Sequence, residues 1–395
     1  MTKIKNFEQL MDCVPKAGGI INEDILLQTF PSLEKLKTTP QDPTYHAEGD
    51  VWTHTKMVIK ELLNDDFYDK ADLQTKFVLF YSALLHDISK PQCTKHEEDG
   101  RISSKGHSGM GAIDTRILLW EKEVPFELRE RICRIVSTHQ VPFFALGHDR
   151  RGRRPEFTLH SLSWEGRVCD LTTLARADMK GRVSIHQKTA LDDLDLFEMM
   201  AREEQCWDKE KYFVDSHTRL QYMKNNGILS LDHSFHQNSG SKVIVMAGLP
   251  ASGKNTYVEQ NHPGLDVVSF DDAKASLGLK QGDNMGQAVH LAIDKAKSLL
   301  REHQPFVWNA THLTPDMRQK TLSLLYQYQA EVQVVYLEQP KSVLFSRNDK
   351  RDSTLSNKAL KEMLLKCNIP LPYEAHQVQY VINSTAKPEY KKMKI

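Results

Sequence analysis

Residues 243–255, VIVMAGLPASGKN, decide the fold of the C-terminal part of this chain. A short apolar run, rich in β-branched side chains, leads directly into a glycine-rich turn, as when a buried strand joins a phosphate-binding loop. Gly248, Gly253 and Lys254 fit the pattern G-x-x-x-x-G-K. Backbone N–H groups of such a loop surround phosphate oxygens, and the lysine adds a mobile positive charge. The sequence therefore predicts a strand, a phosphate-binding loop and a helix in succession.

Strand and helix patterns alternate beyond this loop. Further short apolar runs occupy residues 267–270, 306–308 and 332–337. Helical patterns of apolar side chains lie between them, at residues 285–300 and 317–328. Alternation of this kind predicts a parallel sheet with helices on both faces, so we expect a C-terminal α/β domain.

The N-terminal part has helical patterns instead. Residues 75–85 are apolar nearly all round, as in a buried helix. Apolar side chains recur at helical spacing in residues 107–120, 125–138 and 168–179. Because few runs alternate between apolar and polar residues, we expect this domain to be all-α.

A polar stretch, LDHSFHQNSGSK at residues 231–242, separates the two patterns and is typical of a linker. The predicted architecture is multidomain. An all-α domain is expected over residues 1–235 and an α/β domain over residues 241–395.

The composition excludes several classes of protein. The chain has 395 residues, of which 40% are hydrophobic and 26% charged, so a disordered chain is excluded. We expect a cytoplasmic protein, because no apolar run is long enough to span a membrane and no signal peptide is visible. The six cysteines show no CxxC spacing and are expected to be reduced thiols. Lys+Arg and Asp+Glu both number 52, which excludes a strongly basic binder of nucleic acids but allows a local basic groove.

One position of the phosphate-binding loop departs from the common pattern. The residues expected to bind the nucleotide are Gly248, Ser252, Gly253, Lys254, Asn255 and Thr256. Asn255 stands where a Ser or Thr normally places its hydroxyl on magnesium. Its amide oxygen could bind the metal directly or hold a metal-bound water, and the sequence leaves both open.

Charged residues follow the loop at positions suited to phosphoryl transfer. Asp271 and Asp272 end the next predicted strand, where a carboxylate faces the crevice of a parallel sheet and can accept a proton. The alternative is a helix N-cap pair, a common use of aspartate. Arg347 and Arg351 are four residues apart and can share one helix face, either against a transferred phosphoryl group or in solvent.

The segments GLPASGKNTY, SFDDAK, WNATHL and SRNDKR together resemble the polynucleotide kinase family in order and spacing, over residues 241–395. This resemblance implies that Asp271 is the general base on a 5′-hydroxyl. It implies that Arg347 and Arg351 lie in a helical lid and, with Lys254, contact the phosphates of ATP or another NTP bound with Mg²⁺. Lys274 stands where the family has an arginine for the acceptor phosphate.

Candidate metal ligands concentrate in the N-terminal domain. They are His54, His86, Asp87, His107, His139 and Asp178. Imidazole and carboxylate groups bind divalent metals, and an adjacent His86–Asp87 pair at a helix end can direct both groups into one cavity. A single histidine is more often an ordinary core or surface residue, so the joint pattern carries the prediction.

The same domain carries HAEGDVWTH, LLHDISKP, KGHSGMGA, STHQ and ARADMKGR, in the order found in the HD phosphohydrolase superfamily. The resemblance covers residues 45–210 and is closest to the HD domain attached to some tRNA nucleotidyltransferases. It implies a divalent transition metal held by His54, His86, Asp87 and Asp178. His107 and His139 match the extra ligands of two-metal members, with Asp87 bridging. Lys90 and Arg182 are implied to contact the scissile phosphate.

An HD phosphoesterase followed by a polynucleotide kinase resembles the bacterial HD-Pnk family of end-healing enzymes. The resemblance implies a bifunctional enzyme: a 5′-hydroxyl kinase joined to a metal-dependent 2′,3′-cyclic phosphodiesterase and 2′(3′)-phosphatase. RNA ends are the expected partner, with DNA left open, and a nucleic-acid ligase would use the healed ends. No membrane partner is expected.

Two other functions remain open from the sequence. The first is a small-molecule or nucleoside kinase fused to a nucleotide phosphohydrolase. The second is a regulatory protein in which ATP binding gates an inactive HD domain, an alternative that the unusual Asn255 keeps open.

Overall fold

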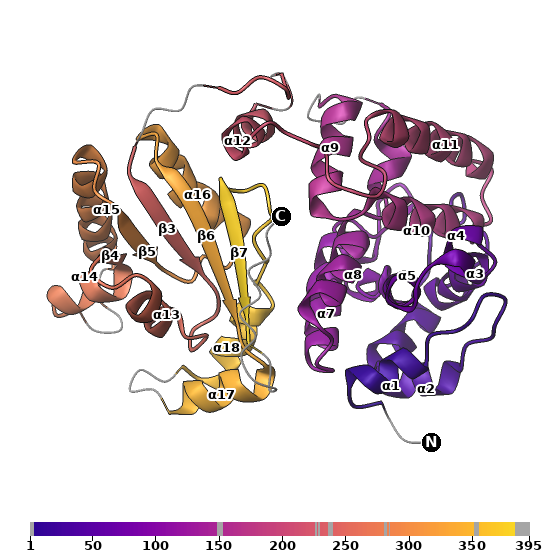
Figure 1. Ribbon diagram of the computed structural model, residues 1–395. Coiled ribbons are helices and arrows are strands. Elements are labelled where there is room, and N and C mark those ends of the chain that lie inside the picture. The colour runs from indigo at the N-terminus through magenta and orange to yellow at the C-terminus, as the bar shows by residue number, and fades with distance from the viewer. Residues whose placement is uncertain are drawn as a thin grey trace. The chain divides into compact units, whose positions relative to one another are not determined.

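The computed structural model describes residues 4–147, 153–225, 227, 230–235, 240–279, 283, 285–350 and 355–383. The chain forms two compact units, Met1–Tyr212 and Phe213–Ile395, and each is described by itself (Figure 1). This division lies earlier than the expected boundary after residue 235. The reason is α12 (Ser216–Lys224), where Arg219 donates hydrogen bonds to the carbonyls of Ala375 (3.2 Å) and His376 (2.9 Å) of the second unit.

The first unit is built from helices. They are α1 (Phe7–Asp12), α2 (Glu23–Thr29), the 3-10 helix η1 (Pro31–Thr38), α3 (Val51–Leu63), α4 (Asp66–Lys70), α5 (Leu73–Leu85), α6 (Lys90–Cys93), α7 (His107–Trp120), α8 (Phe126–Thr138), the 3-10 helix η2 (Val141–Phe144), α9 (Pro155–Glu165), α10 (Val168–Lys180) and α11 (Gln187–Glu203). The strands described in this unit form one antiparallel pair of two residues each, β1 (Lys95–His96) and β2 (Ile102–Ser103). The all-α prediction is therefore confirmed.

Helix α5 lies at the centre of this unit. Its residues from Phe77 to Leu85 are fully buried, as expected for a segment that is apolar nearly all round. The helix begins at Asp72, whose carboxylate accepts a hydrogen bond from the Thr75 N–H (2.7 Å). Helices α3, α8 and α10 pack against it.

The second unit is a parallel α/β domain, as predicted. Its strands are β3 (Lys242–Ala247), β4 (Asp266–Ser269), β5 (Phe306–Asn309), β6 (Glu331–Glu338) and β7 (Gln377–Ile382). Its helices after α12 are α13 (Lys254–Asn261), α14 (Phe270–Ser276), α15 (Gly286–Arg301), α16 (Pro315–Gln327), α17 (Lys341–Asp349) and α18 (Asn357–Leu364). The strands pair in parallel in the order β4-β5-β3-β6-β7, and the helices flank the sheet (Figure 1).

The register of the sheet places three strand ends at one edge. Met246 of β3 pairs with Asn309 of β5, which pairs with Ser269 of β4. The phosphate-binding loop therefore leaves the sheet beside the segment that carries Asp271. In doubly wound sheets this carboxyl edge is where ligands bind.

Strand β7 is the element of the sheet that the sequence analysis did not predict. Its sequence, QVQYVI, alternates polar and apolar residues and pairs on one side only, with β6. A short edge strand gives a weak signal because only its partly buried positions need to be apolar.

Within the described part of the chain, we find no helix that combines the length and the apolar character needed to cross a bilayer.

Gly181 provides a test of the packing in the helical unit. It follows α10, and a Cβ placed there would lie 2.7 Å from the backbone nitrogen of Val58 in α3. We expect Gly181→Ala to destabilise this unit by roughly 1–3 kcal/mol, because the contact is with backbone and cannot relax by a rotamer change.

Gly109 is the matched control, since it lies exposed in α7 and a Cβ there would meet nothing within 4 Å. Gly109→Ala should leave stability unchanged or raise it by up to about 1 kcal/mol. Urea unfolding followed by tryptophan fluorescence measures both, since Trp52, Trp120, Trp164 and Trp207 lie in this unit. Equal free energies of unfolding for the two variants would contradict the close contact between Gly181 and the backbone of Val58.

Candidate functional site

The helical unit brings all six candidate metal ligands to one buried place. His54 lies in the first turn of α3, His86 and Asp87 follow α5, His107 begins α7, His139 follows α8 and Asp178 lies in the last turn of α10. Each of these residues is at most 5% exposed. Helix ends therefore converge on the cluster, and the order of the sequence motifs corresponds to a single site.

Asp87 is the centre of the cluster. Its Oδ1 lies 3.2 Å from His107 Nε2. Its Oδ2 lies 3.1 Å from His86 Nε2 and 2.7 Å from Lys90 Nζ. Burial alone would raise the pKa of this carboxyl, but the charges of His86 and Lys90 and the contact with His107 hold it well below its usual value.

Three of the histidines are oriented in the same way. The Nδ1 atoms of His86, His107 and His139 each lie within hydrogen-bonding distance of a backbone carbonyl three residues earlier in the chain. The acceptors are the carbonyls of Ala83 (2.8 Å), Ser104 (2.7 Å) and Val136 (2.8 Å). A carbonyl can only accept, so each Nδ1 carries a hydrogen, and in a neutral ring the Nε2 then presents a lone pair.

These lone pairs make the cluster suited to a cation. His86 Nε2 and both oxygens of Asp87 are buried, and none of them has a hydrogen bond of acceptable geometry. Acceptors that face each other in a buried site need a proton or a positive ion between them, and a divalent metal is one such ion. Burial also lowers the pKa of His139 to about 3, so its ring is neutral, as a metal ligand must be.

The geometry allows two metal positions that share Asp87. Ligand atoms of His54, His86 and Asp87 lie within 4.8 Å of one another, and so do those of Asp87, His107 and His139. Imidazole and carboxylate donors in such a set fit divalent transition metals.

Asp178 also lies against positive charge. His54 Nε2 is 3.0 Å from its Oδ1, and the guanidinium of Arg182 bonds to both of its oxygens, with Nε at 3.0 Å from Oδ1. Burial alone would raise the pKa of Asp178, but Arg182 and His54 hold it well below its usual value. Arg182, one helical turn later, thus lies beside the cluster.

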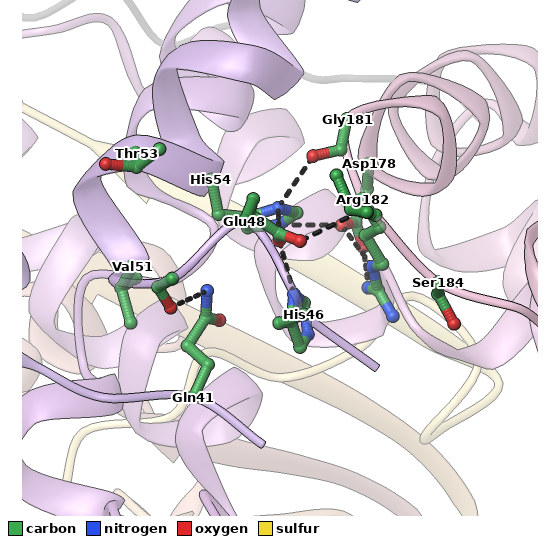
Figure 2. Close-up of polar contacts among 12 residues, drawn as sticks. Gln41, His46, Glu48, Val51, Thr53, His54, Asp178, Gly181, Arg182 and Ser184 are labelled. Atoms are coloured by element: carbon green, nitrogen blue, oxygen red, sulfur yellow. Dashed lines mark hydrogen bonds and ion pairs between the residues drawn. The ribbon is translucent and has the colours of Figure 1, made fainter. Parts of the chain in front are cut away.

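Glu48 and His46 join the cluster, although the sequence analysis did not name them as site residues. Glu48 Oε1 accepts from His46 Nδ1 (2.8 Å) and lies 3.0 Å from His54 Nδ1, and Oε2 accepts from the Val183 N–H (2.9 Å) (Figure 2). The carbonyl of Gly181 also lies 3.2 Å from His54 Nδ1. Glu48 therefore orients the His54 ring with Nε2 toward the cluster, as carboxylates do behind metal-binding histidines.

Gln41 was missed as well. Its Oε1 accepts from Lys90 Nζ (2.7 Å), so Lys90 is held between this amide and Asp87. The signal for Glu48 was present in the motif at residues 46–54, whereas nothing in the sequence around Gln41 indicated its contact with Lys90.

The phosphate-binding loop of the second unit has the conformation that its glycines allow. Gly248 has φ +136°, and a Cβ there would lie 2.5 Å from the carbonyl oxygen of Leu337, so only glycine fits. Gly253, with φ +99°, precedes α13. The ammonium group of Lys254 donates to the carbonyls of Gly248 (3.0 Å) and Leu249 (2.9 Å), across its own loop.

Arg347 reaches this loop from α17. Its Nη1 would lie 3.2 Å from a Cβ on Gly253, so the guanidinium lies directly over the start of α13. Ser252 is 1% exposed, and its hydroxyl oxygen is buried without a hydrogen-bond partner. A cationic side chain over a loop with an unpaired hydroxyl is suited to phosphate oxygens.

Asn255 contacts the end of β5. Its Oδ1 accepts from Asn309 Nδ2 (2.8 Å), so the two amides form a pair beside the phosphate-binding loop. Thr256 is the next residue of α13. Asn309 belongs to the segment WNATHL, and the structure gives it this contact.

Asp271 and Asp272 are exposed in the first turn of α14. The side chain that begins this helix is Ser269, whose hydroxyl accepts from the Asp272 N–H (3.2 Å), so neither aspartate is the N-cap. Lys274 lies one turn further along the same helix. Arg351 lies outside the described residues.

Comparisons with known proteins address both units. Residues 243–370 match the AAA domain family. The Multifunctional CCA protein of Laribacter hongkongensis is 31% identical over 181 residues, which are 44% of this chain and 41% of that protein. The Multifunctional CCA protein of Halorhodospira halophila is 29% identical over 151 residues, 34% of each chain. This chain thus spans less than half the length of the curated relatives it matches.

Solved structures similar to this chain cover about a third of it. Chaetomium thermophilum Kti12 in complex with ADP-AlF3 is 15% identical, with a TM-score of 0.29, over 35% of this chain and 88% of that one. A gluconokinase from Sinorhizobium meliloti 1021 is 19% identical, with a TM-score of 0.27, over 39% and 86%. The family match, the glycine-rich loop and the parallel sheet show that the C-terminal unit is a P-loop α/β domain. The His/Asp cluster of the helical unit is consistent with an HD domain.

Glu48→Gln tests the orientation of His54. An amide replaces one of the two carboxylate acceptors with a donor, so it cannot accept from both histidine rings and the Val183 N–H, and the His54 ring should be held less firmly. We expect roughly a 10- to 100-fold weaker affinity for Mn²⁺ or Ni²⁺. Isothermal titration of the chelator-treated protein with each ion measures the change.

The matched control is Glu34→Gln, since Glu34 is an exposed carboxylate of the same unit that pairs only with Lys37 among the contacts described. It should bind the ions as the unchanged protein does. Wild-type affinity in Glu48→Gln would remove Glu48 from any role at the site.

Proposed function

We propose that this chain heals broken RNA ends. Its P-loop unit would transfer phosphate from ATP to a 5′-hydroxyl, and its helical unit would hydrolyse a 2′,3′-cyclic phosphate and then the remaining monoester. The observation that carries the proposal is the presence, in one chain, of two separate centres that each fit phosphate. One is the buried cluster around Asp87, and the other is the loop with Lys254 and Arg347.

The two reactions complement each other chemically. Cleaved RNA often ends in a 5′-hydroxyl and a 2′,3′-cyclic phosphate, whereas a ligase joins a 5′-phosphate to a 3′-hydroxyl. A kinase prepares the first end and a phosphoesterase the second. The similarity to the multifunctional CCA proteins and the order of the motifs support the HD assignment of the helical unit.

The residues of the helical unit would bind and neutralise the phosphate. A divalent metal held by His54, His86, Asp87 and Asp178, with a second on His107 and His139, would lower the pKa of a water and offset negative charge. Lys90, held by Gln41, and Arg182, held by Asp178, present positive charge at the same place. They would orient the phosphate and stabilise the charge on its oxygens as the ester bond breaks.

The P-loop unit would bind ATP with Mg²⁺ on the backbone N–H groups of its loop. Lys254 and Arg347 lie where they can neutralise the phosphates during transfer. Asp271 lies past the end of β4, at the same edge of the sheet, and would take the proton from the attacking 5′-hydroxyl. Arg351 is proposed to act with Arg347.

One RNA tests both reactions together. A short RNA with a 5′-hydroxyl and a 2′,3′-cyclic phosphate is incubated with protein, ATP, Mg²⁺ and Mn²⁺ or Ni²⁺, and both ends are analysed by mass spectrometry. Gain of phosphate at the 5′ end and its loss at the 3′ end are expected. Untouched RNA with hydrolysis of free nucleotides would favour a small-molecule kinase fused to a nucleotide phosphohydrolase, and a parallel DNA substrate establishes the acceptor range.

Single substitutions should separate the two activities. His86→Ala or Asp87→Ala removes a ligand of the metal cluster and should abolish 3′-end healing while the kinase is retained. Lys254→Ala should do the reverse, since it removes the lysine of the phosphate-binding loop. The same RNA assay measures both ends, and circular dichroism verifies folding. Loss of both activities in a folded single variant would contradict two independent centres.

The adjacent aspartates of α14 provide a matched pair for the kinase. Asp271→Asn should lower kinase kcat by roughly 10²- to 10⁴-fold, because the general base is lost. Asp272→Asn removes the same charge one residue later on the same exposed turn and should have a small effect. Steady-state kinetics with a 5′-hydroxyl RNA compares the two variants. Equal kcat values would contradict the assignment of Asp271 as the general base.

A further inference from the structure

A group of exposed side chains lies beside the His/Asp cluster and takes no part in it. Tyr45 is 50% exposed, Val183 49% and Ile185 85%. The ring of Tyr45 is stacked with that of His186, with ring centroids 5.7 Å apart and planes 28° from parallel. We name these four residues the base platform. Large apolar and aromatic groups that remain exposed together on a surface often mark a binding site.

Backbone and side-chain contacts join the two loops that carry the platform. The Ala47 N–H donates to the carbonyl of Val183 (3.0 Å), and the Ser184 hydroxyl donates to the carbonyl of Thr44 (3.4 Å). The Val183 N–H donates to Glu48 Oε2 (2.9 Å). The loop at residues 44–48 is thus fixed to the loop at residues 182–186, so the platform has a defined position.

This position is next to the phosphate-binding groups of the cluster. Tyr45 directly precedes His46, and Val183 directly follows Arg182. The side chains of His46 and Arg182 are 11% and 12% exposed, whereas those of His54, Asp87 and Asp178 are at most 2% exposed. The sequence neighbours of Tyr45 and Val183 are thus more exposed than these three residues of the cluster.

We propose that the base platform binds the nucleobase of the nucleotide whose phosphate is hydrolysed. A ligand that presents a phosphate to Lys90 and Arg182 and a flat aromatic group to Tyr45 is a nucleotide. Stacking on an aromatic side chain accepts any base, as an enzyme acting on RNA ends of varied sequence requires. This inference rests on the proposed phosphoesterase function and adds how the terminal residue is held.

Tyr45→Ala tests the platform, with two substrates that differ only in the base. One is adenosine 2′,3′-cyclic phosphate, and the other is methyl riboside 2,3-cyclic phosphate, which has no base. For the adenosine substrate, KM should rise about tenfold with kcat little changed, because a stacked base contributes roughly 1–3 kcal/mol in both bound states. For the methyl riboside, Tyr45→Ala should change neither constant.

Two further variants make the comparison specific. Tyr45→Phe keeps the ring and should retain the wild-type KM for the adenosine substrate. Tyr212→Ala removes a tyrosine of the same unit that is 70% exposed and outside the platform, and should leave both substrates unaffected. These results together would support stacking of the base.

The remaining outcomes overturn the proposal and differ in what else they overturn. In the first of these outcomes, the two substrates have equal KM values in wild type, and Tyr45→Ala leaves both unchanged. That result would overturn base binding by the platform but leave the proposed phosphoesterase intact. If Tyr45→Ala lowers kcat/KM equally for both substrates, Tyr45 supports the cluster or a protein contact and does not bind the base. Hydrolysis of neither substrate by wild type would overturn the proposed phosphoesterase and the platform with it.

Discussion

A buried carboxylate, that of Asp87, is the constraint on which the helical unit depends. A charge removed from water must be compensated by opposite charge or by a metal, or its burial is too costly. The compensation comes from the ends of several helices, since His86 follows α5, His107 begins α7 and Lys90 begins α6. Helix α7 packs on α8, and α8 packs on the apolar α5, so this packing is tied to the position of one polar group.

Much of this arrangement could be predicted because it is local in the sequence. The phosphate-binding loop, the strand before it and the His86–Asp87 pair are short patterns whose residues act close to where they occur. The contacts of Glu48 with Val183 and of Gln41 with Lys90 could not be derived, because they join segments 135 and 49 residues apart. The same holds for α12, whose place depends on hydrogen bonds to residues 375 and 376.

The two units present positively charged groups in different ways. In the P-loop unit, backbone N–H groups and mobile cationic side chains such as Lys254 and Arg347 lie at the edge of the sheet, near solvent. In the helical unit, the charged groups are buried and fixed by one another. The first arrangement is suited to a large ligand that must enter and leave in each cycle. The second is suited to a small charged group at the end of a longer molecule.

Two histidines of the cluster, His86 and His139, are oriented by the helices that they follow. His86 and His139 each use the Nδ1–H to satisfy a carbonyl of the last helical turn, which has no partner within the helix. The ligand set is therefore assembled by folding alone. A divalent ion that binds such a frame would need little rearrangement of the helices, so less of its binding free energy would be spent on ordering the ligands.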